Sequence, residues 1–304
     1  MRRILLFGAN GQVARELRVS LAPLGELVVV ARHGTHVTAD FTAPESVAVA
    51  VQAVQPDWIV NASAYTAVDR AESEPELALT INGTAVGALA EAAKACGALL
   101  VHYSTDYVFD GQGETPRRED DPVAPLNAYG RTKRAGEEAI LAAGGAHLIF
   151  RTAWVYGLHG ANFMRTMRRL ARERIELNVV ADQIGAPTWS RDIANATALV
   201  LAQLGDDRAR WQRDSGLYNL TSAGQGSWFE FAEAIIDHQR SRETLPVRAV
   251  LPISSAEYPV PARRPAFSVL DGSKLATRFG VRLPDWRDVW RSVERELETC
   301  IDLI

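Results

Sequence analysis

Short apolar runs alternate with alanine-rich helical patterns through the first half of this 304-residue chain. The expected strands are residues 2–8, 26–32, 57–63, 98–104 and 146–157, and the expected helices are residues 11–25, 43–55, 74–97 and 127–144. Nearly uninterrupted apolar strands separated by helices are typical of a parallel sheet that is covered on both faces. Right-handed crossovers make such a sheet doubly wound. We therefore predict an α/β fold built on a doubly wound parallel sheet of the Rossmann type.

The regular alternation weakens after about residue 155. The patterns that follow are a helix, a strand–turn–helix, a further helix and a segment rich in proline and turn residues, over residues 161–177, 178–204, 226–241 and 244–271. We predict an NADP-binding domain over residues 1–154, to which elements from about residues 178–205 return. A smaller α/β C-terminal domain, mainly substrate-binding, is expected over residues 155–304 and would close over the crevice at the sheet edge.

The composition is that of an ordinary globular protein, with 47% hydrophobic and 23% charged residues. A formal net charge of −4 and a pI of about 5.9 do not favour binding to nucleic acid or to a membrane surface. The apolar runs are too short for a transmembrane helix or a signal peptide. Cys96 and Cys300 are too few for a disulfide scaffold. We expect a cytoplasmic protein.

The first turn between strand and helix has the spacing of a phosphate-binding loop. Gly8, Gly11 and Ala14 stand three residues apart in "GANGQVA", directly after the first expected strand. A tight turn needs Gly8, close approach of a pyrophosphate to the backbone needs Gly11, and helix–strand packing needs a small residue such as Ala14. The helix N-terminus would add free N–H groups and a positive dipole end. The loop therefore predicts a dinucleotide site rather than a simple turn.

The end of the second strand bears on the choice between the two nicotinamide cofactors. NAD sites usually carry an acidic residue here, which binds the ribose 2′-hydroxyl. This chain reads "VVVARHG", with Arg32 in place of an acid and Asp40 only after the following loop. A guanidinium pairs well with a 2′-phosphate. We predict NADPH as the cofactor, with NADH as the second choice; the alternative is that Arg32 is an ordinary solvated charge.

A tyrosine and a lysine four residues apart, Tyr129 and Lys133 in "YGRTK", share one face of an expected helix. A neighbouring ammonium favours the phenolate and improves a tyrosine as an acid–base group near neutral pH. The ammonium can also hold the nicotinamide ribose. Thr105 ends a strand in "STDYVFDG" and can donate a hydrogen bond to a carbonyl oxygen, although turn hydroxyls also occur at such positions. Together the three residues predict reduction of a carbonyl, with the proton supplied by Tyr129.

The chain resembles the extended short-chain dehydrogenases/reductases and, within them, the dTDP-4-dehydrorhamnose reductase family. The resemblance runs through nearly the whole chain. Its markers are "LLFGANGQVA", "NASAYTAVDRAESEPE", "VHYSTDYVFDG", "PLNAYGRTKRAGE", "HLIFRTAWVYG", "NFMRTMRRLARER", "DQIGAPT" and "PARRPAFSVLD". Members of the family reduce the 4-keto group of dTDP-4-dehydro-6-deoxy-L-mannose to give dTDP-L-rhamnose, the last step in supplying this sugar for bacterial surface polysaccharides.

The resemblance also implies roles for individual residues. Thr105, Tyr129 and Lys133 would be catalytic. Gly8 and Arg32 are expected to contact the cofactor for the physical reasons given by the loop and the second strand. The further residues that would line the cofactor are Gly11, Gln12, Val13, Asp40, Phe41, Ala64, Tyr65, Thr66, Tyr103, Tyr129 and Lys133. The substrate would contact Thr105, Asp106, Tyr107, Trp154 and Arg264.

Physical reasoning supports part of the substrate site. Trp154 follows a strand at the ligand edge, where an indole can pack on a sugar face, and the alternative is a tryptophan of the core. Arg263 and Arg264 lie in the proline-rich segment and can pair with a diphosphate, since a guanidinium matches phosphate oxygens. The resemblance favours Arg264.

Two positions depart from the family pattern. Tyr65 stands where the family is expected to have histidine, and this change keeps a polar aromatic ring. Some members bind magnesium through glutamates at a dimer interface; Glu16 matches one such position, but Arg191 occupies the second. A guanidinium disfavours a cation beside it unless further carboxylates are present. We therefore expect no metal at Glu16, and a monomer or weak homodimer.

Other functions fit part of the pattern. Epimerases and dehydratases of the same superfamily retain NAD and usually keep the acid that "VVVARHG" lacks. A dehydratase also needs a glutamate after the aspartate, whereas Tyr107 follows Asp106. The chain could also act on another nucleotide sugar, or be an NADP-binding regulatory subunit without turnover. Retention of Thr105, Tyr129 and Lys133 favours a catalyst, and oxidation of NADPH would separate these cases.

Overall fold

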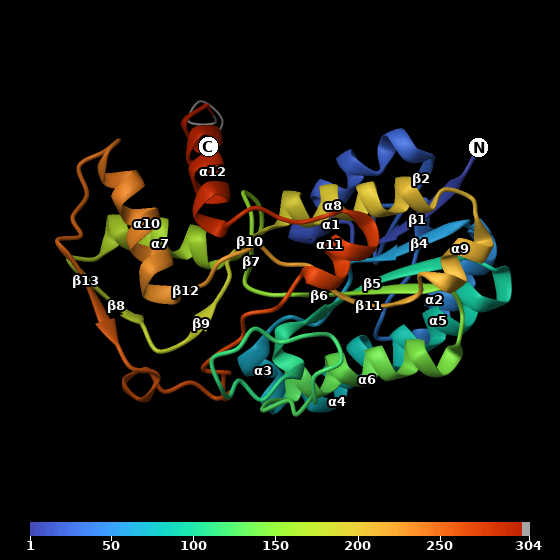
Figure 1. Ribbon diagram of the computed structural model, residues 1–304, viewed down its shortest axis with the longest axis horizontal. Helices are drawn as coiled ribbons and strands as arrows, with labels where there is room; N and C mark the ends of the chain where they lie inside the picture. The colour runs from blue at the N-terminus through green and yellow to red at the C-terminus, as the bar shows by residue number, and fades with distance from the viewer. Residues whose placement is uncertain (300–304) are drawn as a thin grey trace.

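The computed structural model describes residues 1–299 and contains a seven-stranded sheet in the order β11-β6-β5-β4-β1-β2-β3 (Figure 1). Every neighbouring pair in this sheet is parallel. The strands are β1 (Arg3–Phe7), β2 (Glu26–Ala31), β3 (Val37–Thr38), β4 (Trp58–Asn61), β5 (Leu99–Thr105), β6 (His147–Thr152) and β11 (Gly216–Asn219). The predicted doubly wound α/β sheet is therefore confirmed.

Helices cover both faces of this sheet, and alternate strand residues face opposite ways. In β1, Ile4 and Leu6 pack into a cluster with Leu17 of one helical layer, whereas Leu5 and Phe7 pack into the cluster on the other face. The first layer consists of α1 (Gln12–Ser20) and α8 (Ser190–Leu204). The second layer consists of α2 (Pro44–Val54), α5 (Ala85–Cys96) and α6 (Ala128–Ala143).

The helix expected over residues 74–97 is interrupted by a π-helical turn. It consists of α4 (Pro75–Leu79), the turn η2 (Thr80–Thr84) and α5, and it follows the short helix α3 (Val68–Ser73). Within the turn, the buried Asn82 donates to the Tyr65 carbonyl at 3.0 Å and to the Thr132 hydroxyl at 3.1 Å. A π-turn often marks a functional region. Here it ties the loop after β4 to the helix that carries Tyr129.

A second group of elements lies at the other end of the molecule (Figure 1). It contains β8 (Glu176–Val180), which pairs in parallel with β13 (Ala249–Ile253). The helices α7 (Phe163–Glu173), α10 (Trp228–Arg240) and α12 (Trp286–Thr299) bury a shared cluster that includes Met164, Phe231 and Trp290. Within the segment 178–204, the strand thus joins β13 rather than the large sheet, while α8 packs on α1 against that sheet. The proposed division at residue 154 stays a prediction.

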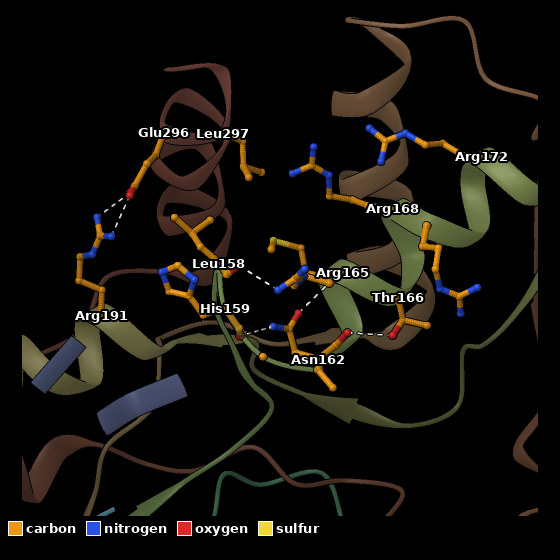
Figure 2. Close-up of a pocket in the computed structure, with 14 residues that line it drawn as sticks. Leu158, His159, Asn162, Arg165, Thr166, Arg168, Arg172, Arg191, Glu296 and Leu297 are labelled. Atoms are coloured by element: carbon orange, nitrogen blue, oxygen red, sulfur yellow. Dashed lines mark hydrogen bonds and ion pairs between the residues drawn. The ribbon is translucent and has the colours of Figure 1, made fainter. Parts of the chain in front are cut away.

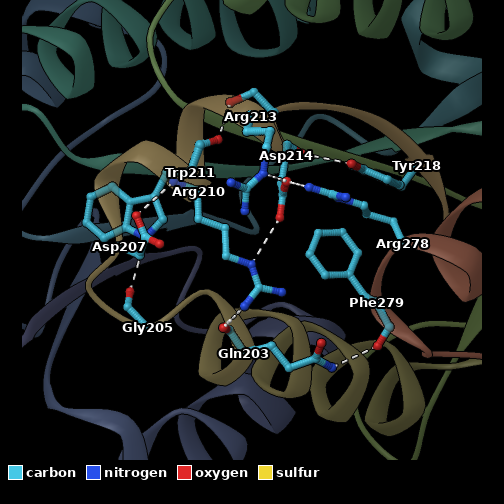
Figure 3. Close-up of polar contacts among 11 residues, drawn as sticks. Gln203, Gly205, Asp207, Arg210, Trp211, Arg213, Asp214, Tyr218, Arg278 and Phe279 are labelled. Carbon is cyan, nitrogen blue, oxygen red and sulfur yellow. Dashed lines mark hydrogen bonds and ion pairs between the residues drawn. The ribbon is translucent and has the colours of Figure 1, made fainter.

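A later segment returns to the large sheet through β11, which was not expected from the sequence. Buried Asp214 lies two residues before this strand, between α9 (Arg208–Arg213) and α11 (Ser273–Phe279) (Figure 3). Its carboxylate pairs with Arg210 at 3.2 Å and with Arg278 of α11. The Tyr218 hydroxyl of β11 donates to the Asp214 carbonyl at 2.8 Å. These contacts fix α9 and α11 at the edge of the sheet.

The lengths of the helices and the state of Cys96 bear on two expectations from the composition. No helix within residues 1–299 is long and apolar enough to cross a membrane. Cys96 is a free, half-buried thiol at the end of α5, and burial raises its pKa. Cys300 lies outside the described residues.

Candidate active site

The carboxyl ends of four neighbouring strands meet at one edge of the large sheet. In the sheet, β1 lies between β2 and β4 and pairs with both. The strand order therefore reverses between β1 and β4. Ligands of doubly wound sheets bind in the crevice outside this point. The register aligns Phe7 with Asn61 and Thr105 with Thr152. The loops that follow these strands are those expected to hold cofactor and substrate.

The phosphate-binding loop has the geometry that its glycines require. Gly8 has φ +97°, and a Cβ at this position would lie 2.7 Å from the carbonyl carbon of Ala62. Gly11 is the N-cap of α1 and offers no side chain to the first amides of the helix. Those amides are therefore oriented for an anion, which fits the pyrophosphate of a dinucleotide. Gln12 accepts from Asn162 at 2.8 Å, and Val13 packs partly into the core below.

Arg32 and Asp40 come together beyond the second strand. The exposed Arg32 lies 3.5 Å from the Asp40 carboxylate (Nε to Oδ2). The backbone N–H of Thr42 donates to Asp40 at 2.9 Å, and this bond lowers the pKa of the carboxyl, with a smaller contribution from Arg32. Phe41 is buried edge-to-face on Phe7, with 5.6 Å between ring centroids. A guanidinium and a carboxylate are thus both available near this end of the crevice.

The loop after β4 exposes Ala64 and Thr66 and holds Tyr65 between them. The Tyr65 N–H donates to Asn82 at 2.8 Å, and the Tyr65 hydroxyl donates to Glu74 at 2.6 Å. The bond to Glu74 raises the pKa of Tyr65. The tyrosine that replaces the expected histidine is therefore bound to Glu74, between α3 and α4.

Thr105, Tyr129 and Lys133 converge from β5 and α6. Thr105 lies close enough to Tyr129 to lower the pKa of that phenol, and its hydroxyl donates to Asp106 at 2.9 Å. Asn127 caps α6 by accepting from Gly130 at 2.8 Å, which sets Tyr129 in the first helical turn. Lys133 lies one turn further along the same helix. The structure therefore brings the predicted catalytic residues together.

The ionisation of this group differs from the expectation. Burial raises the pKa of Tyr129 to about 12, and the neighbouring Thr105 offsets only part of that rise. Lys133 is 1% exposed, and burial lowers its pKa to about 8. Its Nζ donates to the Tyr103 carbonyl at 2.6 Å. The expected lowering of the Tyr129 pKa by Lys133 is wrong for this arrangement, because burial dominates.

Several buried polar residues behind the site were not found from the sequence. His102 lies 3.1 Å from Lys133 Nζ and 3.0 Å from Asn61. Glu137 of α6 forms a bidentate pair with Arg151 of β6, with both distances 2.8 Å. The signal that could have revealed Asn61, His102 and Arg151 is a polar residue inside an otherwise apolar strand. Tyr103 contributes its carbonyl here, while its hydroxyl bonds to Thr197 at 2.7 Å.

Two of the predicted substrate residues are direct neighbours of Thr105 and Tyr129. Asp106 is 2% exposed, and burial raises its pKa to about 7. Tyr107 packs edge-to-face on Tyr129, with 5.6 Å between ring centroids. Arg264 forms a bidentate pair with Asp69 at 2.7 and 3.1 Å. Arg264 is therefore paired with the Asp69 carboxylate of α3. The neighbouring Arg263 is exposed.

Trp154 has a backbone conformation that is unusual for a bulky residue. Its φ is +49°, in the left-handed region, which costs about 1–3 kcal/mol and persists where the surroundings impose it. Its ring stacks on Trp228 with 3.5 Å between centroids and a 5° interplanar angle. A Cβ at Gly185 would lie 2.4 Å from the indole, so the ring also lies against this glycine. Trp228, the first residue of α10, was not found from the sequence.

The glutamate at the possible magnesium position is paired with an arginine. Arg191 of α8 contacts Glu16 of α1 at 2.9 Å and Glu296 of α12 at 2.6 Å. A guanidinium thus occupies the space between these two carboxylates. Within the described residues 1–299, no group of three or more His, Cys, Asp or Glu side chains could hold a metal ion.

A pocket of about 1190 Å³ lies between α7 and α12, and Tyr129 is not part of its lining (Figure 2). Arginines of α7 dominate its lining: Arg165, Arg168, Arg169 and Arg172. Arg191 and Glu296 form its rim (Figure 2). Asn162, which bonds to Gln12, connects this pocket with the phosphate-binding loop. The pocket contains none of the residues predicted for the site.

Comparison with known proteins extends the agreement to the whole chain. The family model of the RmlD substrate binding domain matches residues 1–298. A dTDP-4-dehydrorhamnose reductase of Burkholderia thailandensis is 53% identical over 94% of this chain and 95% of that protein, and one of Escherichia coli K12 is 46% identical over 97% and 98%. The crystal structure of Bacillus anthracis dTDP-4-dehydrorhamnose reductase in complex with NADP is 34% identical, with a TM-score of 0.84 over 96% of this chain and 98% of that one. The chain therefore belongs to the dTDP-4-dehydrorhamnose reductase family.

Proposed function

We propose that this chain reduces the 4-keto group of dTDP-4-dehydro-6-deoxy-L-mannose to give dTDP-L-rhamnose, the last step of dTDP-rhamnose biosynthesis. The observation that carries the proposal is the proximity of Thr105 to Tyr129, close enough to lower the pKa of that phenol, at the same sheet edge as the phosphate-binding loop. Two relatives that match nearly the full chain, at 53% and 46% identity, are named dTDP-4-dehydrorhamnose reductase. The substrate class is accordingly a nucleotide sugar.

The residues of the crevice fit NADPH. Gly8, Gly11 and the free amides that begin α1 suit the pyrophosphate, together with Gln12 and Val13. The exposed Arg32 suits a 2′-phosphate, and its ion pair with Asp40 would exchange for that phosphate. Phe41, Ala64, Tyr65, Thr66 and the Tyr103 carbonyl would complete the walls. NADPH supplies the hydride when bound, and the Bacillus anthracis relative was crystallised with NADP.

Tyr129 is suited to donate the proton. With a pKa of about 12, its phenol keeps the proton at neutral pH until a developing alkoxide takes it. Thr105 would orient the carbonyl oxygen by donating to it, which requires its hydroxyl to turn from Asp106. At a pKa of about 7, Asp106 is partly protonated at neutral pH and can then donate to Thr105 instead. Lys133 would hold the nicotinamide ribose.

The substrate would lie between the two groups of elements. Tyr107 borders Tyr129, and Trp154 presents an indole that the stack on Trp228 holds in place. Arg264 is placed for the diphosphate, where it would share its guanidinium between the phosphate oxygens and Asp69. We further propose a cytoplasmic location, no nucleic-acid or membrane partner, and a monomer or weak homodimer. Arg191 takes the place of a magnesium ion in this proposal.

The test is oxidation of NADPH by the purified protein, with dTDP-4-dehydro-6-deoxy-L-mannose generated in the cuvette. We expect substrate-dependent oxidation that yields dTDP-L-rhamnose and exceeds the rate with NADH. Tyr129→Phe should lose about 10²–10⁴-fold in kcat, because it removes the general acid. Tyr258→Phe is the matched control, since Tyr258 is exposed and belongs to none of the proposed sites, and it should stay near the parent rate. NADPH binding without turnover would favour a regulatory subunit or another nucleotide sugar.

A further inference from the structure

The ring of Trp154 is held from both faces. The Trp228 ring lies parallel to it, with a 5° interplanar angle and 3.5 Å between centroids. A Cβ at Gly185 would lie 2.4 Å from Cε2, 2.6 Å from Nε1 and 2.7 Å from Cζ2 of the Trp154 indole. The nearest atom, Cε2, is shared by the two rings, so Gly185 approaches the face; an approach from the edge would bring Nε1 or Cζ2 nearest. Because Trp228 leaves no room on its own side, Gly185 covers the opposite face.

The two residues that hold this ring are joined to each other through the backbone. Gly185 ends β9 (Ile184–Gly185), which pairs antiparallel with β12 (Gly226–Ser227). Trp228 follows β12 directly as the first residue of α10, where a capping box closes the first helical turn. The spacing between Gly185 and Trp228 is therefore set by strand pairing and a helix cap, and it does not depend on Trp154.

Trp228 also packs on the core of the second group of elements. Phe163 of α7 lies 4.6 Å from Trp228 between ring centroids, and it stacks at 5.8 Å on the buried Phe231. Trp154, by contrast, has the left-handed φ of +49°, which persists only where the surroundings impose it. The position of the Trp154 indole is thus set by Gly185 and Trp228.

With both faces covered, the part of Trp154 that remains for a ligand is its edge. The residue is half-buried, so part of the ring is accessible. Within residues 1–299 its Nε1–H has no hydrogen-bond partner, and this atom is not sealed from solvent as the Nε1 atoms of Trp286 and Trp290 are. An indole N–H can only donate, so it suits an oxygen acceptor.

We propose that Gly185 and Trp228 are positioning residues that clamp Trp154, so that the indole meets the nucleotide sugar with its Nε1–H edge and not with its face. The edge would donate to an oxygen of the sugar or of the diphosphate. A hydrogen bond is directional, so a fixed ring makes this contact selective. The role in substrate binding rests on the proposed function, whereas the geometry of the clamp does not.

The first test detects the clamp without a ligand. Two tryptophan rings stacked this closely couple their electronic transitions and give an exciton couplet in the far-ultraviolet circular dichroism spectrum. We expect Trp154→Phe and Trp228→Phe to lose the same couplet. Trp211→Phe is the control and should keep it, since Trp211 is buried elsewhere and donates to the Gly205 carbonyl at 3.1 Å. A parent spectrum without the couplet, or a couplet that survives in Trp228→Phe, would overturn the clamp.

The second test loosens the clamp from each side and measures substrate binding. In Gly185→Ala the three atoms nearest to the new Cβ all belong to the Trp154 indole, whereas in the control Gly272→Ala the Cβ meets only the Asn219 carbonyl oxygen, at 3.8 Å. Gly185→Ala and Trp228→Phe should raise KM for the nucleotide sugar about 2–10-fold, the range for a lost aromatic stack, with the Kd for NADPH unchanged. An unchanged KM in variants that have lost the couplet would reduce both residues to packing.

The third test separates edge from face by adding dTDP-L-rhamnose to protein labelled with ¹⁵N at the indoles. We expect the Trp154 Nε1–H signal, assigned by its loss in Trp154→Phe, to shift while the couplet stays. Loss of the couplet would show that the ligand enters between the two rings, and an unmoved Nε1–H signal would exclude the edge contact; either result overturns the proposal. A parent protein that shows the couplet but does not bind dTDP-L-rhamnose would refute the proposed function and, with it, the role of the clamp in substrate binding.

Discussion

The ion pair between Glu137 and Arg151 fixes the helix that carries Tyr129 and Lys133 to the sheet. The two side chains are 0% and 1% exposed and share two hydrogen bonds of 2.8 Å. Burial by itself would raise the pKa of Glu137, but the bonds and charge of Arg151, together with Ser104 and Arg134, outweigh it, and the net pKa is lowered. A lowered carboxyl pKa stabilises the fold fully above the unfolded value, and this contribution is lost as the pH falls through the folded value. The pair therefore contributes fully at pH 7–8.

Glu137→Gln keeps the shape of the side chain and removes its charge. The Arg151 guanidinium then stays buried opposite a neutral amide, which costs about 3–5 kcal/mol in free energy of unfolding. The next residue offers a matched control. Glu138 pairs with Arg134 at 2.8 Å on the surface, where the two side chains are 60% and 27% exposed. Glu138→Gln should cost only about 0.3–0.5 kcal/mol.

The assay is thermal unfolding followed by circular dichroism at pH 7.5. One kcal/mol corresponds to about 2–4 °C in Tm for a domain of this size. Glu137→Gln should therefore lower Tm by roughly 6–20 °C, and Glu138→Gln by about 2 °C or less. Equal losses in the two variants would refute the reasoning. The double variant Glu137→Leu/Arg151→Met should recover much of the loss, because it leaves no unpaired buried charge.

Three further predictions follow from single contacts. Gly8→Ala should unfold more easily than Gly34→Ala and should lose NADPH binding. Both glycines have a positive φ (+97° and +79°). Of the two, only Gly8 has no room for a Cβ, which would lie 2.7 Å from the backbone of Ala62. Asp106 has its pKa raised to about 7, so its contribution to stability is full below pH ~4 and is lost as the pH rises toward 7; the Tm of the parent relative to Asp106→Asn should accordingly fall between pH 5 and pH 8. Arg191→Glu places a third carboxylate beside Glu16 and Glu296, so millimolar Mg²⁺ should raise the Tm of this variant and leave that of the parent unchanged.

Much of the fold was predictable because its strands and helices follow from the local order of apolar and polar residues. Apolar runs such as residues 98–104 and alanine-rich helices repeat in a regular order, and this order requires a parallel sheet with ligands at its carboxyl edge. The elements that were missed are short or atypical. β11 (Gly216–Asn219) has only four residues and begins with glycine, and β13 (Ala249–Ile253) contains a proline, which usually argues against a strand.

The sequence by itself determined the chemistry that depends on spacing. The glycines of the first turn, the four-residue interval from Tyr129 to Lys133 and the position of Thr105 at a strand end each specify a local geometry, and their order along the chain identifies the family.

The tertiary structure decided the ionisation and the partners of these groups. Lys133 faces His102 from a strand 31 positions away, and Arg264 finds Asp69 across 195 positions. Burial turned the expected lowering of the Tyr129 pKa into a rise. Protonation depends on desolvation and on neighbours brought together by packing, and neither is encoded in the spacing of residues along a strand or a helix.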